Sequence, residues 1–295
     1  MKEAFQQLFL FSVPLSIYSI LIIAEMIISY VHNKNYYTTK GTLANIYLSS
    51  LNFGLDVLLR SFGLYILNTF YQFHFFEIHT VFLYWFVLLV VQDFMFYVLH
   101  YVDHYCRFFW AVHVTHHSSE EFNLSVGFRS SVFQPLYRFV YFIPLALMGF
   151  KGIDIAVMYS ATQIYGILIH TQTIGKLGFL EWFMATPSNH RVHHGSNPQY
   201  LDKNMGMVFI IWDRLFGTFE EEKEVVKYGL TQNIKTHHPL KMVFHEWQEI
   251  LNDLRKSVSF KEKFMYIFGP PGWSHDGSKK TSRQLKEVWE KQLKF

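Results

Sequence analysis

The sequence has 295 residues, of which 51% are hydrophobic, 19% aromatic and 17% charged, and its formal net charge is +3. That charge is too small for a nucleic-acid binder. The single cysteine, Cys106, can form neither an intrachain disulfide nor a thiolate metal site. Residues 1–175 contain 17 Lys, Arg, Asp and Glu, whereas residues 176–295 contain 32. An apolar first part and a polar, mildly basic last part favour an integral membrane protein.

Five apolar segments are predicted to be helices, namely 8–31, 43–70, 80–99, 132–150 and 153–170. A helix needs about 20 apolar residues to cross the bilayer core, and the first and third segments satisfy this. The first is also too long for a signal peptide and is interpreted as an uncleaved membrane helix. The last two are short and could form a hairpin that enters the bilayer without crossing it. We therefore expect an all-α integral membrane fold with about four or five transmembrane helices and a helical cytoplasmic cap.

The distribution of Lys and Arg predicts the orientation of the chain. The link 32–42 contains Lys34 and Lys40, the segment 101–131 contains Arg107 and Arg129, and 18 further basic residues follow position 175. The link 71–79 contains none. Because cytoplasmic loops are enriched in Lys and Arg, the links 32–42, 101–131 and 171–295 are expected in the cytoplasm. The chain is thus predicted to be multi-pass, and helices are predicted in its polar part over 239–255 and 282–293.

Nine of the 16 histidines lie between residues 100 and 194. Eight of them form three spaced groups, H-x3-H and two copies of H-x2-H-H, and the ninth follows the fifth apolar segment. Residues three or four apart share one helix face, so each group directs its imidazoles the same way. Neutral imidazole is a common metal ligand, and so many of them predict more than one metal ion. The candidate ligands are His100, His104, His113, His116, His117, His170, His190, His193 and His194.

The composition of these groups narrows the choice of metal. With no second cysteine, zinc thiolate and iron–sulfur sites are excluded. Asp and Glu are nearly absent from the groups, so an oxygen cage for a hard cation is disfavoured. Imidazole ligation suits Fe, Cu, Zn or Ni. The remaining histidines lack ligand spacing and are interpreted as ordinary polar residues: His32, His74, His79, His237, His238, His245 and His275.

Several polar residues are candidates for supporting roles, each of which could instead be purely structural. Asp93 precedes His100 by two helical turns and could accept its ring N–H, and Gln163 has the same spacing to His170. Asn189 adjoins His190 and could bond a ligand. The loop after the second group offers two further polar residues, Glu120 and Asn123. A carboxylate in an apolar helix is costly in lipid, so Glu25 is expected to face protein or water.

The three histidine groups, in this order between apolar helices, resemble the fatty acid hydroxylase/sterol desaturase superfamily of membrane non-haem di-iron oxygenases. The surrounding segments are similar to its alkylglycerol monooxygenase-like branch at 109–120 (FWAVHVTHHSSE), 186–195 (TPSNHRVHHG) and 211–219 (IWDRLFGTF). The resemblance covers roughly 80–235, and a GPPGW segment at 269–273 looks like a family tail motif. It divides the chain into N-terminal transmembrane helices (1–79), a histidine-box domain (80–220) and a cytoplasmic C-terminal tail (221–295).

The resemblance implies that the nine histidines are the metal ligands and catalytic residues, and that they hold two non-haem iron ions. It also implies O2 as co-substrate and a membrane lipid as substrate, either an ether lipid, a sterol or a fatty acyl chain, which is hydroxylated or desaturated. The sequence has no dinucleotide loop, Walker loop or haem-attachment pair. Electrons must therefore come from an external donor protein or a reduced pterin. A histidine-rich membrane metal transporter is the alternative, and its ligands would line a path inside the bilayer.

One position departs from the branch. There, the second histidine of the first group is followed by a Glu that is associated with pterin-dependent activity, whereas here Tyr105 follows His104. A phenol cannot replace a carboxylate as a charged acceptor at neutral pH. The expectation is that this chain takes electrons from a protein that docks on basic residues around Arg191, Lys203 and Arg214.

Overall fold

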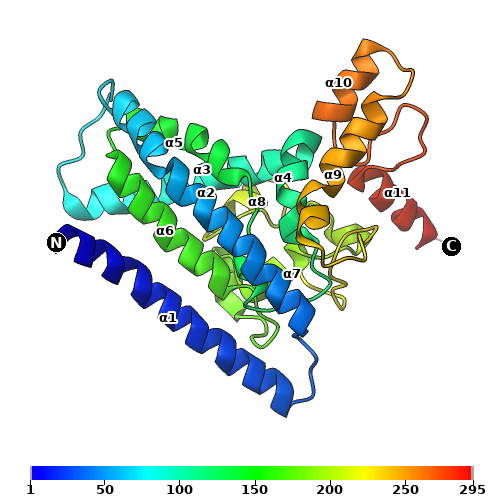
Figure 1. Cartoon of the computed structure of the whole chain (residues 1–295), viewed down its shortest axis with the longest axis horizontal. Coiled ribbons are helices and arrows are strands. Elements are labelled where there is room, and N and C mark those ends of the chain that lie inside the picture. The colour runs from blue at the N-terminus through cyan, green and yellow to red at the C-terminus, as the bar shows by residue number, and fades with distance from the viewer. Residues whose placement is uncertain (1, 294–295) are drawn as a thin grey trace.

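In a computed structural model of the chain, the backbone is described for residues 2–293 and the side chains for residues 17–293. Within these residues the regular structure is helical, and the only bridges are two isolated pairs, Met184 with Phe209 and Gly195 with Tyr228. This confirms the expected all-helical class. Figure 1 shows a bundle that contains α1, α2, α3, α5 and α6, and beside it a cap that contains α4, α7 to α11 and long irregular segments.

The bundle is built from α1 (Lys2–Val31), α2 (Thr39–Tyr71), α3 (Val81–Tyr105), α5 (Arg138–Leu147) and α6 (Gly152–Leu168). Helices α2, α3, α5 and α6 pack on one another around a core that includes Leu67, Leu88 and Leu145. Many large apolar side chains on α2 and α3 remain exposed, among them Leu58 and Phe82, which are 75% and 79% exposed. Exposed apolar surface of this extent on a helical bundle is typical of contact with lipid.

Two helices, α2 and α3, are long and apolar enough to cross a membrane, among the residues whose side chains are described. The remaining apolar helices are shorter or only partly described. The side chains of residues 8–16, in the first predicted helix, lie outside the described part. Helix α5 has 10 residues and α6 has 17, which correspond to about 15 Å and 26 Å, less than the roughly 30 Å core of a bilayer.

The fourth predicted helix begins later than expected. Residues 132–137 form a turn and the short 3-10 helix Gln134–Leu136, and α5 starts at Arg138. Pro135 favours this turn because its ring fixes the backbone at a helix start. The Gln134 amide and the Tyr137 hydroxyl both donate to Asp103 of α3, at 3.1 and 2.7 Å. The turn therefore satisfies a buried carboxylate that a longer helix would leave unpaired.

Charged groups within the bundle are paired. Arg60 donates to Asp56 one turn earlier on α2 at 2.8 Å, as the i, i+4 spacing predicts, and Arg138 of α5 also bonds Asp56. Glu25 of α1 is 3% exposed and faces protein, as expected. Its carboxylate accepts from the hydroxyls of Tyr37 and Thr171 and from the Leu124 backbone N–H. Glu25 thus ties α1 to the two loops that follow the second histidine group and His170.

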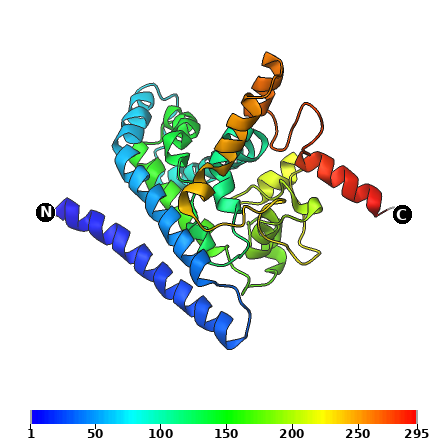
Figure 2. The same cartoon turned by 45° about the vertical axis from the view of Figure 1, so that its right-hand side comes forward.

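The cap contains α4 (Arg107–His117), α7 (Pro187–His193), α8 (Ile211–Phe216), α9 (Pro239–Leu254), α10 (Phe260–Phe268) and α11 (Ser282–Gln292). Helices α9 and α11 match the ranges predicted from the sequence. Helix α10 was not predicted as a separate element, although its start carries a signal. Ser259 and Glu262 form a capping box in which each side chain bonds the other's backbone. Figures 1 and 2 both show α9 and α10 running across the direction of α1 and α2.

Candidate metal centre

The nine spaced histidines lie together in the structure. They form two groups, and within each group one ring nitrogen per residue lies within 4.8 Å of the others. The first group has five members, His100, His104, His113, His117 and His193, and the second has four, His116, His170, His190 and His194. Eight of the nine are buried and His116 is partly buried. The histidines that lack ligand spacing belong to neither group.

A sharp bend between α3 and α4 brings the histidines at the end of α3 face to face with the histidines of α4. Helix α3 ends at Tyr105, Cys106 is extended (φ −116°, ψ 117°), and α4 starts at Arg107. The Arg107 backbone N–H donates to the Gly269 carbonyl at 2.9 Å, which fixes the start of α4. The rings of His100 and His113 then meet with their Nε2 atoms 3.0 Å apart. The i, i+4 spacing within each helix, together with this bend, assembles four of the five members of the first group.

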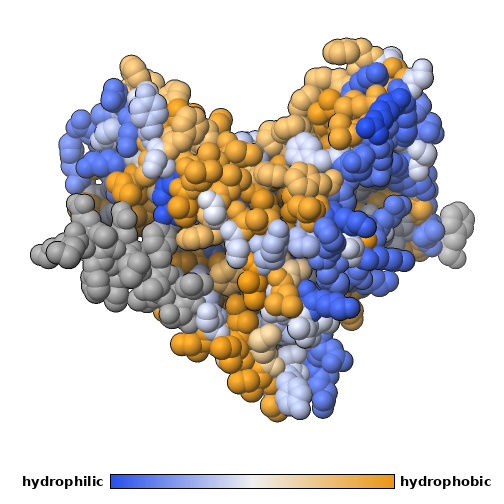
Figure 3. Space-filling model, in the orientation of Figure 1, coloured by the Kyte–Doolittle hydropathy of each residue, from blue (hydrophilic) through white to orange (hydrophobic). Residues whose placement is uncertain are grey.

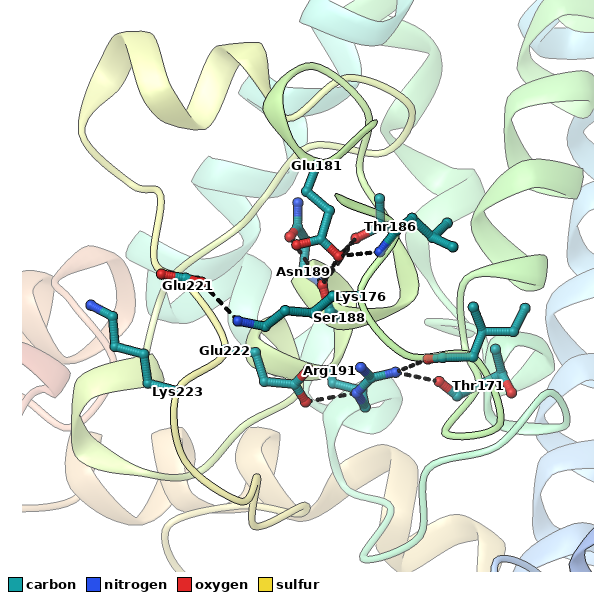
Figure 4. A network of polar contacts seen from close by, with 12 residues as sticks. Thr171, Lys176, Glu181, Thr186, Ser188, Asn189, Arg191, Glu221, Glu222 and Lys223 are labelled. Carbon is teal, nitrogen blue, oxygen red and sulfur yellow. Dashed lines mark hydrogen bonds and ion pairs between the residues drawn. The ribbon is translucent and has the colours of Figure 1, made fainter. Parts of the chain in front are cut away.

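Helix α7 carries the third histidine group and is only seven residues long. Thr186 caps it by accepting from the Asn189 backbone N–H, and Pro187 occupies the first turn, where no backbone donor is needed. Figure 4 shows the contacts around this helix. Glu181 accepts from Ser188, and Arg191 donates to Glu222 at 2.7 Å and to the carbonyls of Thr171 and Ile174. A short helix is thereby held firmly enough to position three imidazoles.

Hydrogen bonds at Nδ1 fix the orientation of most of these rings. Because a carbonyl oxygen can only accept, Nδ1 must carry the proton where it bonds one. This applies to His100 (Met205 O, 2.7 Å), His116 (Arg129 O, 2.8 Å), His170 (Gly166 O, 2.6 Å) and His193 (Lys203 O, 2.9 Å). His104 Nδ1 bonds the Asp202 carboxylate at 3.2 Å. In each of these rings Nε2 is left unprotonated and free to bind a metal.

Several of the inward nitrogens lack a hydrogen-bond donor, which is a condition that a metal would satisfy. The Nε2 atoms of His104, His193 and His194 are buried without a hydrogen-bond partner. His116 and His170 both carry their protons on Nδ1, so their facing Nε2 lone pairs, 3.4 Å apart, cannot bond each other. Two nitrogens bound to one metal at about 2.1 Å would lie about 3.0–3.4 Å apart. The residues present therefore fit a centre for metal ions with imidazole ligands.

Burial keeps the imidazoles in the neutral form that metals bind. Desolvation lowers the pKa of His113, His117, His190, His193 and His194 well below 6.5, and the neighbouring imidazoles lower it further. Burial lowers the pKa of His116 to about 4, although its bond to the Arg129 carbonyl acts in the opposite direction. At neutral pH these rings are uncharged, so each has a lone pair available.

Most of the predicted supporting roles are wrong. Asp93 does not bond His100; it accepts from the backbone N–H of Val208 and Phe209 and from the Trp212 indole. His100 instead bonds a carbonyl, a group that every residue offers. Likewise, His170 bonds the Gly166 carbonyl and not Gln163, whose Nε2 has no partner. The Asn189 side chain bonds the Met184 carbonyl at 3.5 Å and not His190.

Neither of the two loop candidates bonds a histidine among the described residues. Glu120 is exposed, and Asn123 bonds the Tyr36 carbonyl and Ser125. Arg191, expected to offer charge to a docking protein, is 7% exposed and is neutralised by Glu222.

The sequence did not identify the residues that bond the outward-facing Nδ1 atoms of the histidine rings. Asp202 bonds His104, and Ser131 Oγ lies 3.1 Å from His113 Nδ1. Arg129 is buried, and its guanidinium donates to the Thr115 carbonyl, Ser118 and Asn45 of α2. Its own carbonyl accepts from His116, so it joins α2, α4 and the second metal group. Arg129 was visible in the sequence only as a basic residue in a loop, with no spacing to connect it to a histidine.

A cavity of about 760 Å³ leads from the cap surface to the first metal group. Its inner wall includes His104, His117 and His193, together with His194 of the second group. The outer walls come from α9, from residues 229–234 and from the segment before α11. The cavity gives a small molecule access to the imidazoles from the side of the cap.

Comparisons with known proteins find relatives that are lipid oxidoreductases by name. Residues 85–218 match the family described as fatty acid hydroxylase. Alkylglycerol monooxygenase of Homo sapiens is 41% identical over 212 residues, which are 72% of this chain and 47% of that protein. The enzyme of the same name from Xenopus tropicalis is 40% identical over 189 residues, 64% of this chain and 42% of that protein. Ornithine lipid hydroxylase OlsE of Rhizobium tropici is 30% identical over 132 residues, 44% and 40% of the two chains.

The chain spans less than half the length of these relatives. No solved structure matches the chain significantly.

Proposed function

We propose that this protein, whose residues 85–218 match the fatty acid hydroxylase family, is a membrane-bound non-haem di-iron oxygenase that hydroxylates or desaturates a lipid. The observation that carries the proposal is the division of nine histidines into adjoining groups of five and four. Such a division suits two metal ions with open positions. Bound iron would supply activation of O2 for attack on an unactivated C–H bond. The nine histidines are the proposed ligands.

The chain's own residues orient the ligands and bury most of them, while the cavity of about 760 Å³ leaves access to them from the side of the cap. Carbonyls and Asp202 hold the Nδ1 protons, so each imidazole presents Nε2 without rearrangement. Arg129 and the network of Figure 4 fix the second and third histidine groups. No residue needs to act as a nucleophile. Electrons come from an external donor, and the lipid class is an ether lipid, a sterol or a fatty acyl chain.

The arrangement of the ligands favours an oxygenase over a histidine-rich metal transporter. A transporter needs polar ligands spaced along a path through the bilayer. Here the nine histidines converge in one buried cluster at the ends of α3 and α6 and in the cap helices α4 and α7. A compact cluster holds metal in place and suits catalysis.

Purified protein should contain about two iron ions per chain, because two centres with four or five ligands each use all nine histidines. Elemental analysis measures this directly. Lipid mass spectrometry of cells with and without the gene should show a lipid that differs by one added oxygen or by the loss of two hydrogens. Zinc as the sole metal in protein that is active as purified would overturn the di-iron proposal.

The proposed topology is multi-pass, with the nine histidines on the cytoplasmic side. The proposed domains are the N-terminal transmembrane helices (1–79), the histidine-box domain (80–220) and the cytoplasmic C-terminal tail (221–295). Tags inserted at 32–42, within 101–131 and at the C-terminus should all report the cytoplasm, and a tag at 71–79 the opposite side. The reason is the distribution of Lys and Arg. Protease protection in sealed membrane vesicles checks this. A tag at 101–131 on the far side would separate the metals from cytoplasmic electron donors and contradict the proposal.

A further inference from the structure

Helices α9 and α10 form a hairpin with one exposed apolar side. Exposed side chains recur at helical spacing on each helix, which is the pattern of an amphipathic helix. Six large apolar side chains form this side and are between 45% and 86% exposed: Leu240, Phe244 and Leu251 on α9, and Phe260, Phe264 and Phe268 on α10. Figure 3 shows apolar surface on the side of the α9–α10 hairpin that faces the bundle, and polar surface on its other side.

The inner side of the hairpin is fixed to the metal-binding core. Arg107, at the start of α4, donates to Glu246 and Asp253 of α9, both at 2.7 Å, and to the Tyr266 carbonyl of α10. Burial raises the pKa of Asp253, but hydrogen bonds from Lys256, Arg107 and Lys279 outweigh it and lower the pKa to about 2. The hairpin is therefore an ordered part of the fold, and its apolar side has a defined direction.

The contact between α9 and α2 places the hairpin at one end of the membrane bundle. Met242 and Val243 pack against Ala44 and Leu48 of α2, five and nine residues after the helix begins at Thr39. At 1.5 Å per residue this contact lies about 8–14 Å from the end of a helix about 50 Å long. The bilayer core is only about 30 Å thick, so this part of α2 suits the membrane surface.

The apolar side of the hairpin is continuous with the exposed apolar surface of α2. The Phe244 ring contacts Phe133, whose segment packs with the same Ala44 and Leu48 cluster. In the same turns of α2, Leu43 and Ile46 are 60% and 56% exposed. Since α9 and α10 run across the direction of α2 in both views (Figures 1 and 2), the pair lies roughly in the plane of the bilayer that α2 crosses.

We infer that the α9–α10 hairpin lies in the membrane interface on the side of the histidine cluster, with its apolar side inserted into the lipid leaflet. The inference rests on the proposed membrane-bound function. Amphipathic helices in this position bury their apolar side about 5–10 Å into the boundary between headgroups and acyl chains. The basic residues beside it, Arg255, Lys261 and Lys263, can extend to lipid phosphates. Continuity with α2 favours the bilayer over a soluble partner.

The test uses the full chain with Cys106→Ser, which removes its single cysteine. A single cysteine at Leu251 carries a fluorophore, and Asn252→Cys, on the adjoining polar face, is the matched control. In lipid vesicles with nitroxide-labelled lipids, the label at Leu251 should be quenched roughly two-fold more strongly than the label at Asn252. Aqueous iodide should show the opposite order. Phe264→Cys repeats the measurement on α10, in case one variant folds poorly.

Two results would overturn the inference. Iodide quenching at Leu251 and Phe264 as strong as at Glu290→Cys, on the exposed face of α11, would place the hairpin in water. Protection from both quenchers would show that protein covers the face, and crosslinking would then test for a second copy of the chain. Fluorescence needs neither iron nor turnover, so failure of the di-iron proposal would leave this result unaffected.

Discussion

Replacing His104 by alanine is expected to reduce product formation by at least about 100-fold, because the loss of a mere outer partner of a metal ligand already costs 10–100-fold. His104 lies in the group of five, and its Nε2 is buried without a partner. His116→Ala should have the same effect through the group of four. The iron content of the purified variants and the yield of oxidised lipid are the two measurements. The same loss is expected at each of the other seven proposed ligands.

The matched control is His237→Ala, an exposed histidine outside both groups, which should leave most activity and both iron ions in place. Asp202→Asn is a milder variant of the His104 site. Its uncharged amide oxygen can still accept the Nδ1–H bond, but more weakly than a carboxylate does, so metal affinity should fall by about 10-fold while the ligand remains. Wild-type product formation by His116→Ala would refute the assignment of the ligands.

The sequence was informative about the site where the ligands repeat at helical spacing. His113, His116 and His117 share a face of α4 because residues three and four apart are neighbours on any helix. Bringing them to His100 requires the bend at Cys106, and bringing them to His193 requires the long return of the chain through α5 and α6. The membership of the two metal groups, five histidines in one and four in the other, therefore emerges only from the folded chain.

The outer partners could not be predicted, for a physical reason. Three of the rings bond backbone carbonyls: His100 that of Met205, His116 that of Arg129 and His193 that of Lys203. Every residue has a backbone carbonyl, so the amino-acid sequence does not indicate which one a histidine will bond. The spacing between Asp93 and His100 was correct for one helix face. It misled because the loop at 208–212 offers Asp93 three donors, and a buried carboxylate is stabilised by as many donors as can reach it.

For the fold, apolar length predicted α3 well, since a membrane span depends mainly on a sustained apolar run. The segment 43–70, which apolar length did not single out, is also long and apolar enough to cross a membrane as α2. The segment 132–150 misled because the apolar pattern does not reveal the buried Asp103, which draws Gln134 and Tyr137 into a turn. Nor does a segment's own pattern show that one amphipathic helix, α9, packs against α2.

Membranes that contain this protein should oxidise lipid with a reductase and ferredoxin-like donor, and should remain inactive with reduced tetrahydropterin alone. The reason is Tyr105, which occupies the place of the Glu that is associated with pterin use. Its ring stacks on Tyr101 with centroids 4.1 Å apart, and it ends α3 directly after the ligand His104. The assay compares ether-lipid and fatty-acid oxidation with each reductant added separately.

Neither nearby acid is free to replace the missing carboxylate. Asp103 is fully buried and already accepts from Gln134 and Tyr137, and Asp202 is engaged with His104. Tyr105→Glu should therefore gain turnover supported by pterin, whereas Tyr105→Gln, of similar size but uncharged, should not. Robust pterin-dependent activity of the unaltered chain would contradict this argument. It would show that pterin use does not depend on a carboxylate at position 105.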